Sequence, residues 1–535
     1  MGQARYIFVT GGVSSSLGKG IIVASLGMLL QARGFKVSIQ KFDPYVNINS
    51  GLLNPRELGE CYVTDDGLEA DVDLGHYERF LDVRTTKNSC VTSGRIYKSV
   101  IEKERKGDYL GKTVQVIPHI TDEIKRCIKQ GKAEDCDFVI SEIGGTVGDI
   151  ESLPFIEGIR QMVLDNPREC LCIHLTYIPF LAASQELKTK PTQHSVKALL
   201  EMGVLPDVLV LRTEHKLPKE LKRKVALFCN VTENAVVEAI GASSIYEEPL
   251  NLYNEGLDKA VLRKFGIPLG KEPALEGWKR FTNRMKRAAN VVRIGLVGKY
   301  VEAPDAYRSI SEALLHAAVA QNLRLELSLF QADQVTDENV AKKLNGLDAV
   351  LVAPGFGQRG GEGKIAAAKY ARIHNIPFFG IGLGMQCGLV EIARNVVGLR
   401  DAELGEVNGD ADHPIFALME KEKAALKMTG TMRLGAYDCQ LVEASLVREL
   451  YGADCVSERH RNRFEFDNQY REVFEKAGVR FSGVNPQTGF VEIVELPSHR
   501  WYVGTLFQPE FKSTVMRPHP LFMGFVKAAV EGREL

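Results

Sequence analysis

A glycine-rich loop between a short strand and a helix is the segment of this chain best suited to bind phosphate. The apolar run YIFVT (6–10) leads into GGVSSSLGKG (11–20) and then into the helical pattern IIVASLGMLLQARG. In this arrangement backbone N–H groups and a helix start surround phosphates, and Lys19 would reach the β- and γ-phosphates. Five residues separate Gly12 from Gly18, and Gly20 stands where the common loop has a magnesium-binding Ser or Thr. The sequence therefore predicts nucleotide binding with metal ligands from elsewhere.

Two acidic residues are candidates for those metal ligands. Asp73 lies in DVDLGHYERF, and Glu142 ends a predicted strand in VISEIGGTVGDIES, where ligands gather in open α/β sheets. Taken singly, each acidic residue would be interpreted as a solvent-exposed or helix-capping residue. Mg²⁺ prefers one or two carboxylates together with phosphate oxygens. The pair therefore predicts a magnesium site.

The elements that must position these groups follow an α/β pattern. Short β-branched runs, such as KVSIQKF (36–42) and CLCIHLTYI (170–178), alternate with helical segments, which is typical of a parallel sheet covered on both faces. The basic amphipathic segment 276–290 interrupts the pattern, and a second α/β series begins at VVRIGLVGKYV (291–301). We predict a first domain over 1–268, a linker over 269–290 and a second domain over 291–535.

Composition excludes several classes of function. The 535 residues are 45% hydrophobic and 25% charged, with a net charge of −1, which argues against general binding to nucleic acid or to an anionic membrane. The ten cysteines form no CxxC pair or zinc-spaced cluster, as expected for reduced thiols. The N-terminus has no signal-peptide pattern, and no apolar run approaches the length of a membrane helix. We expect a cytoplasmic protein.

Motifs along nearly the whole chain together resemble the CTP synthase family, in the family's order. They are GGVSSSLGKG (11–20), KFDPY (41–45), DVDLGHYERF (71–80), SEIGGTVGDIES (141–152), KTKPTQHSVK (188–197), ALFCNV (226–231), GTMRLG (430–435), ERHRNRFE (458–465) and PHPLFMGFVKAA (518–529). The resemblance implies a P-loop-type, doubly wound parallel-sheet amidoligase domain followed by a class I glutaminase α/β domain. It also implies ATP-dependent amination of UTP to CTP through a 4-phosphorylated UTP.

The resemblance assigns nucleotide contacts residue by residue. Lys19 and Lys41 would assist phosphoryl transfer, and Asp73 with Glu142 would hold Mg²⁺. The implied ATP contacts are Ser16, Leu17, Gly18, Lys19, Gly20, Ile21 and Asp73. The implied contacts to UTP, or to CTP as feedback inhibitor, are Ser15, Asp149, Ile150, Glu151, Lys188, Thr189, Lys190, Pro191, Thr192, Gln193 and Lys224. The clustered lysines suit a triphosphate held by a protein without net positive charge.

The chain departs from the family on the route from glutamine to ammonia. In FFGIGLGMQ (378–386) Gly382 stands at the position of the nucleophilic cysteine, and in GTLFQPEF (504–511) Gln508 stands at that of the catalytic histidine, with Glu510 retained. Leu58 replaces a histidine that lines the ammonia passage in the family. Loss of a nucleophile costs on the order of 10⁶ in kcat. Cys387 is expected to be a packing thiol inside the following helix rather than a substitute nucleophile.

Other parts of the glutaminase half match the family. The implied glutamine contacts are Gly355, Leu383, Gly384, Met385, Gln386, Glu403 and Arg463. Arg359 and Glu362 match residues of the loop through which GTP, an allosteric effector in the family, acts. The resemblance also implies homodimers that pair into homotetramers.

Three functions are consistent with this combination of features. The sequence favours a CTP synthase that uses free ammonia because its glutaminase triad is lost. The alternatives are a fully glutamine-dependent CTP synthase with another nucleophile, and a non-catalytic regulatory or filament-forming paralogue.

Overall fold

The computed structural model describes residues 4–405, 412–418 and 432–531 and divides into two compact units. The first unit holds Met1–Ser50 and Asp73–Thr282, and the second holds Gly51–Val72 and Asn283–Leu535. The short segment Gly51–Val72 thus groups with the C-terminal half, although it lies within the N-terminal half of the sequence. The boundaries 1–268, 269–290 and 291–535 remain a prediction.

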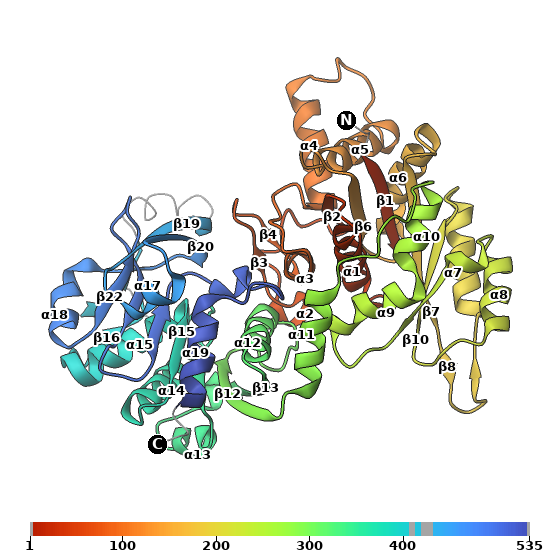
Figure 1. Ribbon diagram of the computed structural model, residues 1–535. Coiled ribbons are helices and arrows are strands. Elements are labelled where there is room, and N and C mark those ends of the chain that lie inside the picture. Colours follow the sequence, from red (N-terminus) through yellow and green to blue (C-terminus); the bar gives the residue numbers. More distant parts are fainter. Residues whose placement is uncertain (1–3, 406–411, 419–431, 532–535) are drawn as a thin grey trace. The chain divides into compact units, whose positions relative to one another are not determined.

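The first unit is built on a parallel sheet in the order β11-β10-β7-β1-β6-β2-β5, of which Figure 1 labels β10, β7, β1, β6 and β2. Its strands are β1 (Arg5–Gly11), β2 (Val37–Asp43), β5 (Cys90–Thr92), β6 (Phe138–Ile143), β7 (Cys170–Ile178), β10 (Val208–Thr213) and β11 (Val236–Ile240). These strands are rich in apolar residues because helices bury both faces of the sheet. The predicted parallel sheet is confirmed.

Helices cover the two faces of this sheet. On one face α1 (Lys19–Ala32) packs with α9 (Glu248–Glu255) and α10 (Leu257–Lys264). The other face carries α4 (Ser93–Lys106), α5 (Thr121–Gln130), α6 (Leu153–Asp165), α7 (Lys190–Glu201) and α8 (Lys219–Phe228). The remaining elements are α3 (Val72–Leu81), α11 (Glu276–Arg287) and a small hairpin of β8 (Phe180–Leu181) and β9 (Glu186–Leu187).

The second unit contains a mixed sheet in the order β13-β12-β14-β15-β24-β23-β22-β19-β20. Its parallel half consists of β12 (Asn290–Gly298), β13 (Leu323–Gln331), β14 (Ala349–Val352), β15 (Phe378–Ile381) and β24 (Tyr502–Thr505). Its antiparallel half consists of β19 (Arg433–Leu441), β20 (Cys455–Asn462), β22 (Arg480–Val484) and β23 (Val491–Glu495). The parallel half matches the predicted second α/β series, whereas the antiparallel half was not predicted.

Two helix layers enclose the mixed sheet. One core contains α12 (Arg308–Ala320) and α19 (Pro520–Glu531), and the other contains α14 (Gly361–Ile373) and α15 (Leu383–Ile392). Shorter elements are α13 (Val340–Leu344), α17 (Leu446–Tyr451), α18 (Arg471–Lys476), β16 (Ala402–Glu403), β17 (His413–Pro414), β18 (Phe416–Ala417) and β21 (Glu465–Phe466). Among the described residues, no helix is both long and apolar enough to cross a membrane.

The segment Gly51–Val72 is held in the second unit by a buried arginine. It forms α2 (Pro55–Leu58) and the hairpin of β3 (Tyr62–Val63) and β4 (Glu69–Ala70). Arg459 of β20, which is fully buried, donates from Nη1 to Tyr62 Oη at 2.9 Å and to the Val63 carbonyl at 3.0 Å, and it pairs with Asp65. Tyr62 in turn donates to the Phe511 carbonyl at 3.0 Å. The segment is therefore an integral part of this unit.

Candidate active site

Four charged side chains predicted to serve phosphate chemistry lie at one edge of the first sheet. The register pairs Glu142 of β6 with Lys41 of β2 and with Val9 of β1, so the acid and the lysine are on adjacent strands. Lys41 forms an ion pair with Asp73 at the start of α3 and lies 3.4 Å from Asp43 Oδ1. Lys19, at the start of α1, donates from Nζ to the Gly145 carbonyl at 2.7 Å. These groups meet where parallel strands end, the usual ligand position in such sheets.

The carboxylates of Asp73 and Glu142 perturb each other. Burial and the nearby charge of Asp73 raise the pKa of Glu142 to about 7, and Tyr77 donates a hydrogen bond to it. Burial opposes ionisation of Asp73, but the Lys41 and His76 charges outweigh this effect and hold its pKa below the usual value. A divalent cation between two such carboxylates would offset their repulsion.

The donor set fits Mg²⁺ bound jointly with a nucleotide. Among the described residues, no group of three or more His, Cys, Asp or Glu side chains is placed to hold a metal ion. Two carboxylates suffice for Mg²⁺ when phosphate oxygens complete the coordination. The side chains of Asp73 and Glu142 are therefore suited to a metal that arrives with its phosphates.

Gly20 lies against the carboxylate of Asp73. A Cβ added to Gly20 would lie 2.2 Å from Asp73 Oδ1, far inside van der Waals contact. The space that a Ser or Thr side chain occupies in the common phosphate loop is filled here by the Asp73 carboxylate. This explains the departure of the loop sequence, because Asp73 supplies an oxygen where a hydroxyl would otherwise be.

The residues predicted to contact a second nucleotide lie around α7. Thr189 and Thr192 are buried, whereas Lys190 at the helix start is exposed, and Lys188 pairs with Glu186 of the β8–β9 hairpin. Lys224 is exposed on α8, which packs beside α7. The exposed turn of Asp149, Ile150 and Glu151 follows Gly148, where an added Cβ would lie 4.0 Å from the Cβ of Ala198 in α7.

The phosphate loop itself is open to solvent at its centre. Ser15 and Ser16 are exposed, Leu17, Gly18 and Ile21 are half-buried, and Gly20 is buried. The loop therefore presents its middle residues outward while its last residues join the core of α1.

A cavity of about 320 Å³ in the second unit is lined by Gly382, Gln508 and Glu510, the three positions of the triad that the sequence predicts to be lost. Its walls come from the segments 51–61, 300–310, 354–356, 382–386, 461–463 and 508–511. Gly382 sits in the sharp turn between β15 and α15 with φ +54° and ψ −116°, a strained conformation for any residue with a Cβ. Such a turn is typical of a nucleophile elbow. The elbow's backbone is present without a nucleophile.

Positions 382 and 508 face each other in this cavity. A Cβ added to Gly382 would lie 3.2 Å from Gln508 Nε2 and 3.2 Å from the Cβ of Pro354. Glu510 follows Gln508 and is also buried. Positions 382 and 508 thus adjoin each other, and neither residue can serve as a nucleophile or a base, because glycine has no side chain and an amide is not a base near neutral pH.

Several polar atoms lining the cavity are buried without a hydrogen-bond partner. They are Gln386 Oε1, Arg463 Nε, Gln508 Oε1 and Glu510 Oε2. Burial raises the pKa of Glu510 well above its usual value, because desolvation disfavours the charged carboxylate. Unsatisfied buried groups are costly, and water or a polar ligand in the cavity would satisfy them.

The predicted glutamine contacts divide into two groups. Gly355, Leu383, Gln386 and Arg463 line the cavity. Gly384 and Met385 instead pack into the core, and Glu403 accepts a hydrogen bond from Arg394 Nη2 at 2.5 Å. Cys387 is fully buried in α15, where burial raises its thiol pKa to about 11, as expected for a packing residue.

The predicted GTP-responsive residues are engaged in ion pairs. Arg359 donates to Asp333 Oδ2 at 2.8 Å, and its guanidinium lies 4.9 Å from the ring centroid of Tyr300. Glu362 accepts two hydrogen bonds of 3.0 Å from Arg394 Nη1.

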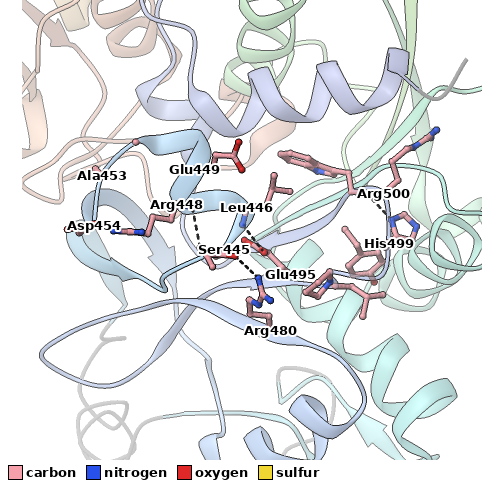
Figure 2. Close-up of a pocket in the computed structure, with 16 residues that line it drawn as sticks. Ser445, Leu446, Arg448, Glu449, Ala453, Asp454, Arg480, Glu495, His499 and Arg500 are labelled. Carbon is pink, nitrogen blue, oxygen red and sulfur yellow. Dashed lines mark hydrogen bonds and ion pairs between the residues drawn. The ribbon is translucent and has the colours of Figure 1, made fainter. Parts of the chain in front are cut away.

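A larger cavity of about 870 Å³ lies beside α17 and the ends of β22 and β23 (Figure 2). Arg448 pairs with Asp454, Glu495 accepts the backbone N–H of Val447 at 2.9 Å, and Arg480 donates to the Ala444 carbonyl at 2.9 Å. None of the predicted site residues lines it. These three charged groups therefore already have protein partners.

Comparison with known proteins decides the family. The family model described as "CTP synthase N-terminus" matches residues 5–267, and "Glutamine amidotransferase class-I" matches residues 302–528. A CTP synthase of Bacteroides fragilis is 59% identical over 532 residues, which cover 99% of this chain and 100% of the relative. This chain belongs to the CTP synthase family.

Further relatives of the family agree. A CTP synthase of Porphyromonas gingivalis is 56% identical over 100% of this chain and 99% of its own length, and one of Flavobacterium johnsoniae is 55% identical over 100% of both. A solved structure described as "Trypanosoma brucei CTPS - glutaminase domain with bound acivicin" matches 45% of this chain and 94% of its own at 40% identity, with a TM-score of 0.43. The identity and coverage of the full-length relatives confirm the family predicted from the motifs.

Replacing Gly20 with alanine should impair the predicted phosphate site without unfolding the protein. The new Cβ would displace the Asp73 carboxylate, and a shift of about 1 Å in a catalytic group can cost about 10² in rate. We expect a loss of about 10²-fold in ammonium-dependent CTP formation. Gly241→Ala is the matched control, because nothing lies within 4 Å of its added Cβ. Equal activity of the two variants would contradict this role of Gly20.

Sequence reasoning missed two features of the site. Tyr77, which bonds to Glu142, lies four residues after Asp73 on the same face of α3, so helical spacing within DLGHYERF was a usable signal. His174, by contrast, lies inside an apolar strand, and nothing in its sequence neighbourhood indicates that it contacts the phosphate loop and α7.

Proposed function

We propose that this chain converts UTP to CTP at the expense of ATP and takes its nitrogen from free ammonia. One observation carries the choice of donor: Gly382 and Gln508 face each other where a nucleophile and its base would stand. The groups suited to phosphoryl transfer, by contrast, are gathered at the edge of the first sheet. A chain with an intact synthetase half and an inactive glutaminase half explains both observations.

The proposed chemistry has two steps. The O4 oxygen of UTP attacks the γ-phosphorus of ATP and ADP departs, because an oxygen on C4 is otherwise a poor leaving group. Ammonia then adds to C4, phosphate leaves with the original oxygen, and the new amino group releases a proton. The chain's task is to position both nucleotides and to stabilise the charge that develops on the transferring phosphoryl group.

Named residues are suited to this task. Lys19 and the loop from Ser16 to Ile21 would bind ATP phosphates, and Lys41 would stabilise the phosphoryl oxygens from the neighbouring strand. Asp73 and Glu142 would hold Mg²⁺, which supplies neutralisation of phosphate charge when it is bound. The carbonyl of Gly145, to which Lys19 now donates, gives that lysine a resting position from which it can turn to phosphate.

The second nucleotide site of the proposal surrounds the start of α7. Ser15, the run from Lys188 to Gln193, and Lys224 would bind the triphosphate of UTP. The exposed turn of Asp149, Ile150 and Glu151 would contact the base or ribose, and CTP would compete there as a feedback inhibitor. The exposure of Lys190 and Lys224 leaves their charges available for an anion.

The cavity of the second unit would still hold glutamine without cleaving it. Gly355, Leu383, Gln386 and Arg463 line it, and its unpaired polar atoms suit an amino acid amide. GTP would have no hydrolysis to activate in this chain, although Arg359 and Glu362 are present. We further propose domains over 1–268 and 291–535, joined by a linker over 269–290, and a homodimer or homotetramer.

The decisive experiment compares nitrogen donors. CTP formation should be followed by absorbance with UTP, ATP and Mg²⁺, and with either ammonium chloride or glutamine. We expect turnover with ammonium and a glutamine rate lower by on the order of 10⁶, the cost of losing a nucleophile from a triad. Comparable turnover with glutamine would favour the fully glutamine-dependent alternative.

The same assay tests the non-catalytic alternative. A regulatory or filament-forming paralogue would bind UTP and ATP and yet form no CTP with either donor. Lys19, Lys41, Asp73 and Glu142 argue against that outcome, because a protein that only binds nucleotides has no need to gather two lysines and two acids at the phosphates.

A further inference from the structure

A buried chain of three polar side chains connects the phosphate loop to α7 in the first unit. His174 in the middle of β7 lies 2.8 Å through Nδ1 from Thr10 Oγ1, at the end of β1. Its other nitrogen, Nε2, lies 2.8 Å from Ser195 Oγ on α7. Thr10 and His174 are fully buried and Ser195 is 7% exposed, so water does not compete for these hydrogen bonds.

The phosphate loop rests directly on the α7 end of this chain. A Cβ added to Gly12 would lie 1.7 Å from Ser195 Oγ, so the loop backbone touches the serine hydroxyl at a point where only glycine fits. The Gly12 N–H also donates to the carbonyl of Leu175, next to His174, at 3.0 Å. The loop backbone, Ser195 and His174 therefore form one continuous set of contacts.

The opposite end of the connection is the start of α7. Two residues beyond His174, on the same face of β7, Thr176 Oγ1 lies 3.0 Å from Thr192 Oγ1. Thr192 belongs to the first turn of α7, which also carries Lys190. Strand β7 thus contacts α7 through Thr192 and through Ser195, and Ser195 also contacts the phosphate loop.

His174 is suited to a fixed connection rather than to a charge switch. Burial, with a smaller effect of Lys19, lowers its pKa to about 3, so the ring is neutral under ordinary conditions. One nitrogen of a neutral imidazole donates and the other accepts, so the orientation of the Thr10 hydroxyl is linked to that of the Ser195 hydroxyl.

We propose that His174 is a positioning residue that couples nucleotide binding at the phosphate loop to nucleotide binding at the start of α7 through Thr10 and Ser195. The inference rests on the proposed function, which assigns ATP to the loop and UTP or CTP to α7. Each nucleotide would fix the end of the Thr10–His174–Ser195 connection that lies nearest to it, and would so prepare the binding site of the other nucleotide.

The test measures binding rather than turnover. The affinity of a non-hydrolysable ATP analogue with Mg²⁺ is determined by calorimetry with and without saturating UTP, in the full-length wild type and in Ser195→Ala. We expect UTP to tighten analogue binding by about fivefold or more in the wild type, the lower range of usual coupling between sites. In Ser195→Ala the factor should fall below about twofold.

Two further variants separate coupling from general damage. Ser25→Ala removes a buried hydroxyl of α1 that has no hydrogen-bond partner and should leave the coupling factor at its wild-type value. His174→Asn, whose amide can still reach Thr10 but not Ser195, should resemble Ser195→Ala. Combining the two should cause no additional loss, because both break the same link.

Each outcome bears on one proposal. Equal coupling in the wild type and Ser195→Ala, or independent binding of the two nucleotides in the wild type, would overturn the role of His174 and leave the proposed function standing. If the wild type bound neither the ATP analogue nor UTP, the proposed function itself would be wrong.

Discussion

Introducing cysteine at position 382 and histidine at position 508 together should create glutamine hydrolysis that neither replacement creates alone. The turn at Gly382 already has the geometry of a nucleophile elbow, and residue 508 lies against the place where the cysteine side chain would begin. Glu510 Oε2 is buried without a partner and would accept a hydrogen bond from the new imidazole. Because intact triads contribute on the order of 10⁶, we expect a gain of at least about 10³-fold in glutamate release over either single variant.

The matched control is the pair Gly382→Ala with Gln508→His. It imposes the same backbone strain, of order 1–3 kcal/mol, without supplying a nucleophile. Both double variants should therefore lose similar thermal stability, while only the cysteine variant releases glutamate. If it binds glutamine and stays inactive, another departure, such as Leu58, has also removed the activity.

Replacing Lys19 with methionine should abolish most ammonium-dependent CTP formation while leaving the fold at least as stable. Removing one well-placed charge from a phosphoryl-transfer site costs about 10²–10³ in rate. Burial lowers the pKa of Lys19, so the folded state disfavours its charge, and an apolar side chain of similar length removes that cost. Steady-state kinetics and thermal unfolding of the same preparation would show the two opposite effects.

Lys36→Met is the control for this prediction. Lys36 immediately precedes β2, and its side chain is 68% exposed. Its ion pair with Asp135 is long, at 3.9 Å, so removing the charge should change neither the rate of CTP formation nor the thermal stability. A Lys19 variant that loses activity only because it unfolds would refute the assignment of Lys19 to phosphate binding.

The parallel sheets were predictable because their signal is local. Mostly apolar, β-branched runs such as 170–178 lack the regular alternation of a half-exposed strand, which is typical of a strand buried on both faces of a parallel sheet. The antiparallel strand β19 includes half-buried and exposed positions as well as buried ones, and it carries charged residues such as Arg433, so its sequence has no clear strand pattern. Arg433 is buried through pairing with Glu465 and Glu492, a tertiary effect that no local window reveals.

The candidate site likewise divides into residues that local motifs predict and contacts that depend on the fold. Lys19, Lys41, Asp73 and Glu142 could be proposed from motifs. The sheet register explains why Lys41 and Glu142 meet, since adjacent parallel strands bring distant segments to one edge, and Asp73 joins them from α3 through its ion pair with Lys41. The contact between Gly12 and Ser195 depends on the packing of α7 against β7. Residues 183 positions apart in sequence come within atomic contact there only through the fold.

The placement of Gly51–Val72 in the second unit bears on how such a protein evolves. Deleting the C-terminal half would leave Tyr62 and Val63 without Arg459 and expose a hairpin that is buried at present. A lineage that stopped using glutamine would therefore be unable to shorten its gene at the domain boundary without harming the half that remains. A domain inherited as an enzyme would be preserved by selection as a scaffold, and its former catalytic cavity would be free to change.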